Sequence, residues 1–252
     1  MDTRHVVVTG ASTGIGRAIA VRVAGDGARV TLLARDRKRL DETAELVGGH
    51  AFVTSCDIRD RRAVDDAFAA AATAHGPIAA LVAVSGIGGP NDEGPDDRFE
   101  ELVATNLVGT YLCCRAALRH LVPGPSARQL VVISSILARI AVPGYTGYSA
   151  SKAGLLGLVR SLAAEVAGDG IHVNAICPGW VDTDMAWEGL DALAESIGGS
   201  RDDAYREAMH AVPLGRMSEP ADIAGTVAWL LSGDSRNVTG QAIDQNGGAW
   251  VG

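Results

Sequence analysis

The chain has 252 residues and a formal net charge of −8 at pH 7, and no basic run stands out, which argues against nucleic acid as a partner. No apolar stretch reaches about 18 residues and no early segment joins a basic start to a long apolar run, so we expect neither membrane spanning nor secretion, and the cytoplasm is the default location. The hydrophobic fraction of 47% is ample for a core, and the cysteines show no metal-ligand spacing, so Cys56, Cys113, Cys114 and Cys177 are interpreted as small core residues and no metal site is expected.

The first predicted element is a strand at residues 5–9, a β-branched run that leads into a glycine-rich loop and then an alanine-rich helical segment. In this order, backbone N–H groups of the loop and the helix N-terminus can face a pyrophosphate. Glycine permits the close approach, although a tight turn without a ligand remains the alternative. The expected cofactor contacts of the loop are Gly10, Ser12, Thr13, Gly14, Ile15 and Gly16.

The second predicted strand, residues 28–34, is followed by Arg35 at the position where a ribose 2′ substituent is read. An arginine there suits a 2′-phosphate, whereas an acidic residue would suit a 2′-hydroxyl. The alternative is a solvated charge within the charged run 35–39. A third strand, residues 51–54, precedes Asp57, whose carboxylate can accept a bond from an adenine amino group or cap a helix beginning near residue 59.

A fourth strand is expected at residues 78–84, and the glycines that follow it again bring backbone close to a ligand. Gly86 is the first of them. Residues 99–121 are predicted to form one long helix that carries Asn106 among apolar neighbours. A buried carboxamide needs hydrogen-bond partners. Asn106 is therefore either an unusual polar residue in the packing or part of a proton relay.

Most of the candidate catalytic residues follow a fifth predicted strand at residues 131–133. Ser135 stands at the end of this strand. Tyr148 and Lys152 follow four residues apart, which places them on one helix face a turn apart. A nearby ammonium stabilises a phenolate and lowers the tyrosine pKa, so Tyr148 could exchange a proton with a reacting oxygen. Tyr145 lacks such a partner and is more plausible as a pocket wall or simple packing.

The rest of the chain continues the alternation of strand and helix. A sixth strand is expected at residues 172–176, a last helix at 223–231 and a short final strand at 242–243. Between them, the mixed pattern of residues 185–212 suits a mobile lid over a site. Alternating strands and helices predict a single-domain, doubly wound parallel sheet of the Rossmann type, with helices on both faces, over residues 1–252.

The chain resembles the short-chain dehydrogenase/reductase family over nearly its whole length, through motifs in this order: the glycine loop, Asp57, Asn106, Ser135 and Tyr148-x-x-x-Lys152. The resemblance implies a homotetramer or homodimer, built partly on the Tyr148 helix. Further cofactor contacts are expected at strand ends and beside the nicotinamide and pyrophosphate, at Ile58, Gly86, Pro178, Gly179, Val181 and Thr183.

The matching tetrad of the family implies a role for each residue. Tyr148 would be the proton donor and Ser135 the hydrogen bond to the carbonyl. Lys152 would lower the tyrosine pKa and hold the nicotinamide ribose, while Asn106 would hold a water in a proton relay. One departure is that the family's Asn-Asn-Ala-Gly segment is here Ala-Val-Ser-Gly at residues 83–86, so both asparagines are missing.

The expected reaction is hydride transfer between a nicotinamide cofactor, with NADPH favoured over NADH, and a ketone or secondary alcohol. Residues 212–216 look similar to bacterial ketoreductases of aromatic polyketide and acyl-thioester pathways. An NAD-dependent dehydrogenase of a sterol, polyol or other secondary alcohol is the alternative enzyme, and a non-catalytic dinucleotide-binding regulator is the alternative of another class. Substrate contacts are proposed at Tyr145, Trp180, Met185 and Trp187.

Overall fold

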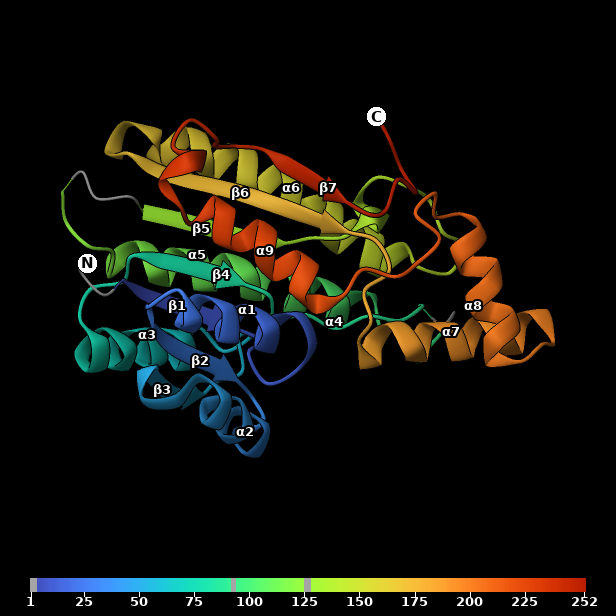
Figure 1. The fold of residues 1–252 in the computed structure, drawn as a ribbon, viewed down its shortest axis with the longest axis horizontal. Helices are drawn as coiled ribbons and strands as arrows, with labels where there is room; N and C mark the ends of the chain where they lie inside the picture. Colours follow the sequence, from blue (N-terminus) through green and yellow to red (C-terminus); the bar gives the residue numbers. More distant parts are fainter. Residues whose placement is uncertain (1–3, 92–93, 125–127) are drawn as a thin grey trace.

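The computed structural model describes residues 4–91, 94–124 and 128–252. Within these ranges, seven strands form one parallel sheet in the order β3-β2-β1-β4-β5-β6-β7 (Figure 1). The predicted doubly wound parallel sheet is confirmed. The strands are β1 His5–Thr9, β2 Arg29–Ala34, β3 Ala51–Ser55, β4 Ala80–Ala83, β5 Arg128–Ile133, β6 Ile171–Pro178 and β7 Ala242–Gln245.

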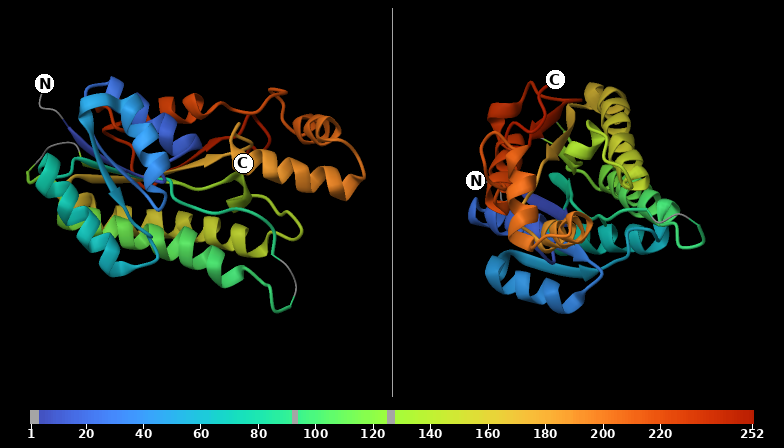
Figure 2. Two further views of the ribbon diagram at one scale, coloured as in Figure 1. Left: turned by 90° about the horizontal axis from the view of Figure 1, so that it is seen from below. Right: turned by 90° about the vertical axis from the view of Figure 1, so that its right-hand side faces the viewer.

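Helices cover both faces of the sheet, as Figure 2 shows. Ile19, Leu40 and Ile223, from three different helices, join one buried apolar cluster with strand residues, and Phe68 and Leu155 join another. β-branched and leucine-rich strands buried on both faces are typical of parallel sheets. The α-helices are α1 Gly14–Gly25, α2 Arg37–Val47, α3 Arg61–His75, α4 Phe99–Val103, α5 Thr110–Arg119, α6 Thr146–Val166, α7 Asp184–Ile197, α8 Arg201–His210 and α9 Pro220–Leu230.

The strand order reverses between β1 and β4, because β2 and β3 lie on one side of β1 and the later strands on the other. At such a switch point the connecting loops separate and leave a crevice outside the carboxyl ends of the strands. Helices α7 and α8 project beyond this edge of the sheet (Figure 1). The topology therefore brings together the segments that follow β1, β4, β5 and β6.

The fifth, sixth and final strands extend beyond their predicted bounds, and two further predicted elements also differ from the observed ones. The fourth strand is shorter than predicted, because Ile78 forms only an isolated bridge with Leu121 and the backbone N–H of Val84 bonds to a side chain instead of a strand. The predicted long helix over 99–121 is divided into α4 and α5 by a π-helical segment, Ala104–Gly109.

The predicted lid segment, residues 185–212, consists mostly of two helices, α7 and α8, where the sequence pattern looked mixed. A capping box marks the start of α8, since the Ser200 hydroxyl accepts the N–H of Asp203 and the Asp203 carboxylate accepts the N–H of Ser200. The pair buries its own apolar cluster, which includes Leu190 and Met209. The Ser-x-x-Asp spacing was the signal in the sequence that could have indicated this helix.

Candidate active site

The glycine loop after β1 depends on backbone that only glycine adopts easily. Gly10 and Gly14 have φ values of 66° and 51°, in the left-handed region. A side chain on Gly10 would lie 2.8 Å from the backbone nitrogen of Ser85, and one on Gly16 would collide with the Gly10 carbonyl oxygen. The loop therefore packs closely against both the start of α1 and the segment after β4.

Thr9, at the end of β1, holds the segment in which the family's two asparagines are missing. Its hydroxyl oxygen accepts the backbone N–H groups of Val84 and Ser85, each at 3.1 Å. These bonds fix the chain just after β4 although residue 83 and residue 84 carry only apolar side chains. Sequence reasoning missed this role, because a threonine at a strand end reads as an ordinary β-former.

The segment after β6 reaches the glycine loop from the opposite side. A side chain on Gly14 would lie 3.0 Å from the Thr183 methyl group, so Thr183 stands directly against the loop. The Thr183 hydroxyl donates to the Val181 carbonyl at 3.1 Å, and Gly179 lies tightly against Asn246. Two of the predicted cofactor segments, far apart in the sequence, are therefore neighbours in the fold.

Asn106 is completely buried in the π-helical segment, and its side chain is fully engaged as a donor. Its Oδ1 accepts the N–H of Ile87 at 2.8 Å, and its Nδ2 donates to the Ile87 carbonyl and to the Ser151 hydroxyl, both at 3.0 Å. Ser151 in turn donates to the Tyr148 carbonyl at 2.7 Å. π-helical segments are frequent at functional sites. Asn106 thus ties the segment after β4 to the helix that carries Tyr148.

Ser135 and Tyr148 come together at the end of β5. Ser135 is buried and caps the short 3-10 turn Ile136–Ala138 through its bond with the Leu137 N–H. Its hydroxyl also lies near enough to the Tyr148 phenol to act on the pKa of that group. Burial raises the pKa of Tyr148 above its ordinary value, while Ser135 acts in the lowering direction. The expected net lowering of this pKa is not found in the protein alone, because burial outweighs the opposing effects.

Lys152 is 5% exposed and lies one turn after Tyr148 on α6. Its Nζ is 5.7 Å from the centroid of the Tyr148 ring and donates to the Ile133 carbonyl at 3.0 Å. A side chain on Gly86 would lie 3.4 Å from this Nζ and 3.1 Å from Asn106 Oδ1, so the two polar groups flank the same glycine. Burial lowers the pKa of Lys152 to about 8. The structure thus brings the predicted tetrad together around the carboxyl ends of β4 and β5.

The other end of the crevice is more open. Arg35 follows β2 directly and is exposed. The Asp57 carboxylate accepts the Arg59 N–H at 3.0 Å and pairs with the Arg59 guanidinium at 2.7 Å, and these bonds hold its pKa below the usual range. The predicted helix-capping role of Asp57 is wrong, because α3 begins at Arg61 and is capped by Asp60. Asp57 caps only a local turn.

A hollow of about 540 Å³ lies beside the glycine loop, between it and α2. Arg17 fastens these two elements, because its guanidinium donates to the Ser12 carbonyl at 2.7 Å and to Glu42 at 3.1 Å. This hollow was not predicted from the sequence. It is lined by Thr13, Arg17, Asp36, Lys38, Arg39, Glu42 and Asp184.

The four proposed substrate contacts lie in different settings. Trp180 and Trp187 pack against the apolar cluster of α7 and α8. Trp187 also stacks on Tyr205 and donates to Asp182 at 2.7 Å, so both tryptophans stabilise the helix pair. Met185 is 45% exposed, and a side chain on Gly88 would lie 3.0 Å from its sulfur.

Tyr145, the fourth candidate, immediately precedes α6 and is half-buried, and its proximity acts to raise the Tyr148 pKa. Met185 therefore contacts the segment after β4, whereas the two tryptophans pack on the apolar cluster of the helix pair.

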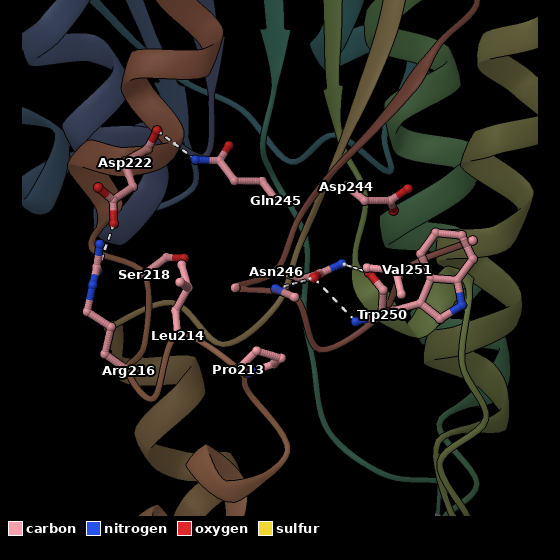
Figure 3. Close-up of a pocket in the computed structure, with 13 residues that line it drawn as sticks. Pro213, Leu214, Arg216, Ser218, Asp222, Asp244, Gln245, Asn246, Trp250 and Val251 are labelled. Atoms are coloured by element: carbon pink, nitrogen blue, oxygen red, sulfur yellow. Dashed lines mark hydrogen bonds and ion pairs between the residues drawn. The ribbon is translucent and has the colours of Figure 1, made fainter.

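A larger cavity of about 750 Å³ lies beyond β7, against the carboxyl-terminal tail (Figure 3). None of the tetrad residues lines it. Asn246 holds the tail through the N–H groups of Gly248 and Trp250, at 3.0 and 3.3 Å. Arg139, which follows the Ser135 turn, lies 5.0 Å from the Trp250 ring and pairs with Asp244 at 3.2 Å. The tail is thus tied to the turn that follows Ser135.

Metal-binding clusters and membrane-spanning helices are both absent from the residues that the structure describes. Among them, no group of three or more histidine, cysteine, aspartate or glutamate side chains could hold a metal ion. No helix within the same residues is long and apolar enough to cross a membrane. The four cysteines are free and buried.

Comparison with known proteins agrees with this geometry. Residues 10–249 match the family model described as enoyl-(acyl carrier protein) reductase. A Streptomyces violaceoruber protein, named as a granaticin polyketide synthase putative ketoacyl reductase, is 36% identical, with 96% of this chain and 91% of the relative covered. The 3-oxoacyl-[acyl-carrier-protein] reductase FabG of Staphylococcus aureus is 31% identical, with 99% of each covered.

A solved structure extends the likeness to three dimensions. A single-substitution variant of the actinorhodin polyketide ketoreductase, crystallised with NADPH, has a TM-score of 0.92 and 33% sequence identity, with 98% of this chain and 97% of that chain covered. The segment that matches the family model includes every tetrad residue and every strand but β1, which precedes it. The chain therefore belongs to the short-chain dehydrogenase/reductase family and is an oxidoreductase.

Proposed function

We propose that the protein reduces a ketone to a secondary alcohol with NADPH, and that Tyr148 supplies the proton. The observation that carries this proposal is the pairing of Ser135 with Tyr148, beside a buried Lys152, at the strand ends next to the glycine loop. A protein that only bound a dinucleotide would have no need of these buried polar groups, which are costly to desolvate.

The cofactor fits the loops that surround the crevice. The backbone N–H groups of the glycine loop and the N-terminus of α1 would hold the diphosphate, with Thr183 close to Gly14. Arg35 is an exposed cation with the geometry to pair with a 2′-phosphate, and the neighbouring hollow carries the further cations Arg17 and Lys38. When bound, the nicotinamide supplies the hydride. The NADPH in the actinorhodin ketoreductase crystal structure also supports this cofactor.

Within this proposal, each tetrad residue handles one part of the proton transfer. Tyr148 stays protonated at neutral pH, because burial raises its pKa, and so enters the reaction as an acid. Ser135 holds the substrate oxygen in reach of the phenol. The Lys152 ammonium has further N–H groups besides the one bonded to Ile133, and it stabilises the phenolate that forms. Asn106 donates both of its amide hydrogens to protein groups, so only its oxygen has capacity left for a relay water.

The substrate class that we favour is a β-ketoacyl thioester or an aromatic polyketide ketone. The names of the granaticin and FabG relatives support acyl and polyketide ketones. The half-exposed Met185 at the start of α7 offers a flexible apolar contact for such a substrate. An NAD-dependent dehydrogenase of a sterol or polyol is the alternative enzyme, and residues 185–212 would serve either enzyme as a lid.

The decisive experiment follows the absorbance of NADPH and NADH with a panel that contains acetoacetyl-CoA, a bicyclic ketone, a quinone and a polyol. We expect NADPH to be oxidised in the presence of one of the ketones. The rate of NAD⁺ reduction with the polyol should be lower than this rate. Faster polyol oxidation with NAD⁺ would favour the alternative enzyme. No turnover with any compound, together with tight dinucleotide binding, would favour a non-catalytic regulator.

We also propose a homotetramer or homodimer that functions in the cytoplasm. Val108 and Tyr111, near the start of α5, are 45% and 41% exposed, and Trp229 on α9 is 40% exposed, so apolar side chains are available to a second copy. Light scattering coupled to size-exclusion chromatography would measure the mass in solution. A mass of one 26.0 kDa chain at micromolar concentration would contradict the expected assembly.

A further inference from the structure

The helix that carries Tyr148 begins without a side-chain cap of its own. Helix α6 starts at Thr146, and its N-cap residue, Tyr145, makes no capping bond through its side chain. The first N–H groups of any α-helix have no partner within the helix and need one elsewhere. In α6 this need arises immediately beside Tyr148, which stands in the first turn.

Asn91, from the loop after β4, supplies the missing partner. Its Oδ1 accepts the N–H of Gly147 at 2.7 Å, and its own backbone N–H donates to the Gly144 carbonyl at 2.6 Å. A side chain on Gly147 would lie 2.9 Å from Asn91 Oδ1 and 3.0 Å from its Nδ2, so the close approach depends on glycine at 147. Asn91 thus forms hydrogen bonds both to the segment before α6 and to the first turn of α6.

Asn91 is itself held in one orientation by Asp97. The Asn91 Nδ2 donates to Asp97 Oδ1 at 2.6 Å, and the same carboxylate oxygen accepts the N–H of Phe99 at 2.9 Å, at the start of α4. A carboxylate accepts and does not donate, so it selects the amide orientation that points Oδ1 at Gly147. The result is a continuous set of bonds from the first turn of α4 to the residue before Tyr148.

We propose that Asn91 is a positioning residue for Tyr148, acting as a cap that is supplied to α6 from another part of the chain. The proposal rests on the role given to Tyr148 above. The bonds of Asn91 described here go to Gly144, Gly147 and Asp97, so Asn91 acts on the phenol through the backbone of α6. The bond at Gly147 fixes the first helical turn, and with it the direction of the Tyr148 ring toward Ser135.

The experiment compares five variants in the reduction of acetoacetyl-CoA, or of the panel ketone that is reduced fastest. Asn91→Ala should lower kcat by about tenfold, because a small misplacement of a catalytic group has a large effect on rate. The dissociation constant for NADPH, measured by fluorescence titration, should change less than about twofold. Asn91→Asp should also lose rate, because it sets two carboxylates against each other at residues 91 and 97.

The exchange variant, Asn91→Asp with Asp97→Asn, tests the bond pattern itself. The carboxylate at 91 would still accept the Gly147 N–H, and the amide at 97 would donate to it. The bond to the Phe99 N–H would be given up, because a single atom, Asp97 Oδ1, now accepts both bonds. We expect kcat to return to within about threefold of the unmodified protein. A folded exchange variant with the low kcat of Asn91→Ala would overturn the proposal.

Arg98→Ala is the matched control in the same loop. Arg98 bonds the Gly88 carbonyl at 3.2 Å and Glu101 at 3.0 Å, both of which lie outside α6, so its loss should leave kcat nearly unchanged. An equal loss in Arg98→Ala would indicate general damage to the loop and contradict the proposal.

Tyr148→Phe separates this proposal from the proposed function. If Tyr148→Phe abolishes turnover but Asn91→Ala does not lower it, Tyr148 is the acid and Asn91 does not position it. If Tyr148→Phe retains turnover, the function assigned to Tyr148 fails, and the role of Asn91 fails with it.

Discussion

The two ends of the crevice along the carboxyl edge of the sheet are formed by different kinds of groups. At the end proposed to bind phosphate, the chain offers the backbone of the glycine loop and exposed cations such as Arg35. At the end proposed to be catalytic, Asn106 and Lys152 are buried, and each is bonded to protein groups. One end thus presents charge and N–H groups to a ligand, while the other holds a few side chains in fixed positions.

The difference reflects what each end must do. A phosphate is already charged and needs only donors in reach, which exposed groups can provide. Proton transfer needs groups with altered pKa values, and burial is the effect that alters them here: it raises the pKa of Tyr148 and lowers that of Lys152 to about 8. Substitutions should therefore change turnover at one end and affinity at the other.

The largest expected effect is that of Tyr148→Phe. This change removes the proposed acid while keeping the ring, so kcat should fall by about 10²- to 10⁴-fold, which is the usual contribution of general acid catalysis. NADPH affinity should stay nearly constant. Steady-state kinetics and a fluorescence titration measure the two quantities. Most of the turnover surviving in the mutant would remove Tyr148 from its assigned role.

Lys152→Arg should have the next largest effect. We expect kcat to fall by about 10²-fold although the positive charge is kept. The planar guanidinium does not fit the buried position in which Nζ bonds the Ile133 carbonyl 5.7 Å from the Tyr148 ring. The chain offers a matched control, because Lys38 is its only other lysine and is exposed. Lys38→Arg should retain normal turnover, and equal rates in both variants would contradict the prediction.

Arg35→Ala should act on affinity and leave kcat almost unchanged. A charge-assisted bond to a phosphate contributes about 1.5 to 3 kcal/mol, or roughly ten- to a hundredfold in the dissociation constant. Titration should show tighter binding of NADPH than NADH, with the gap largely abolished in the variant and NADH affinity little changed.

The control for this change is Arg37→Ala, in the same charged run of residues 35–39. Arg37 is paired with Asp41 at 2.9 Å, so its loss should leave the preference intact. Equal affinities for the two cofactors in the unmodified protein, or a preference that survives Arg35→Ala, would show that Arg35 is only a surface charge.

The smallest expected effect near neutral pH is the pH dependence of kcat/KM, which follows from the lowered pKa of Lys152. Below about pH 8 the ammonium is charged and can stabilise the phenolate, and above it the charge is lost. The phenol itself stays protonated in this range, because its pKa is raised. The kcat/KM for NADPH should therefore be level up to about pH 8 and then fall about tenfold per pH unit.

Arg35→Ala should show the same pH profile at a lower level, since the residue lies at the other end of the crevice from Lys152. A profile that stays level up to pH values well above 8 in the unmodified protein would contradict the need for a charged Lys152.

The elements with strong local patterns were predictable from sequence. The glycine loop between β1 and α1, and the tyrosine and lysine one turn apart on α6, are set by residues close together in the chain, so short-range spacing is sufficient to find them. The parallel sheet followed from the alternation of strands and helices, which leaves few topologies open.

Other features were decided only by tertiary structure, because their partners are remote in sequence. Asn106 bonds residues 19 positions before it and 45 after it, and a carboxamide in a helical pattern does not reveal which partners it will meet. The same holds for the Thr9 hydroxyl, whose donors lie 75 and 76 residues away. The pKa of Tyr148 belongs to this class, since the degree of burial depends on packing from several segments and here outweighs the lowering effect of Ser135. The sequence by itself therefore determined which chemical groups the protein carries and on which elements, while the packing of those elements decided their hydrogen-bond partners and protonation.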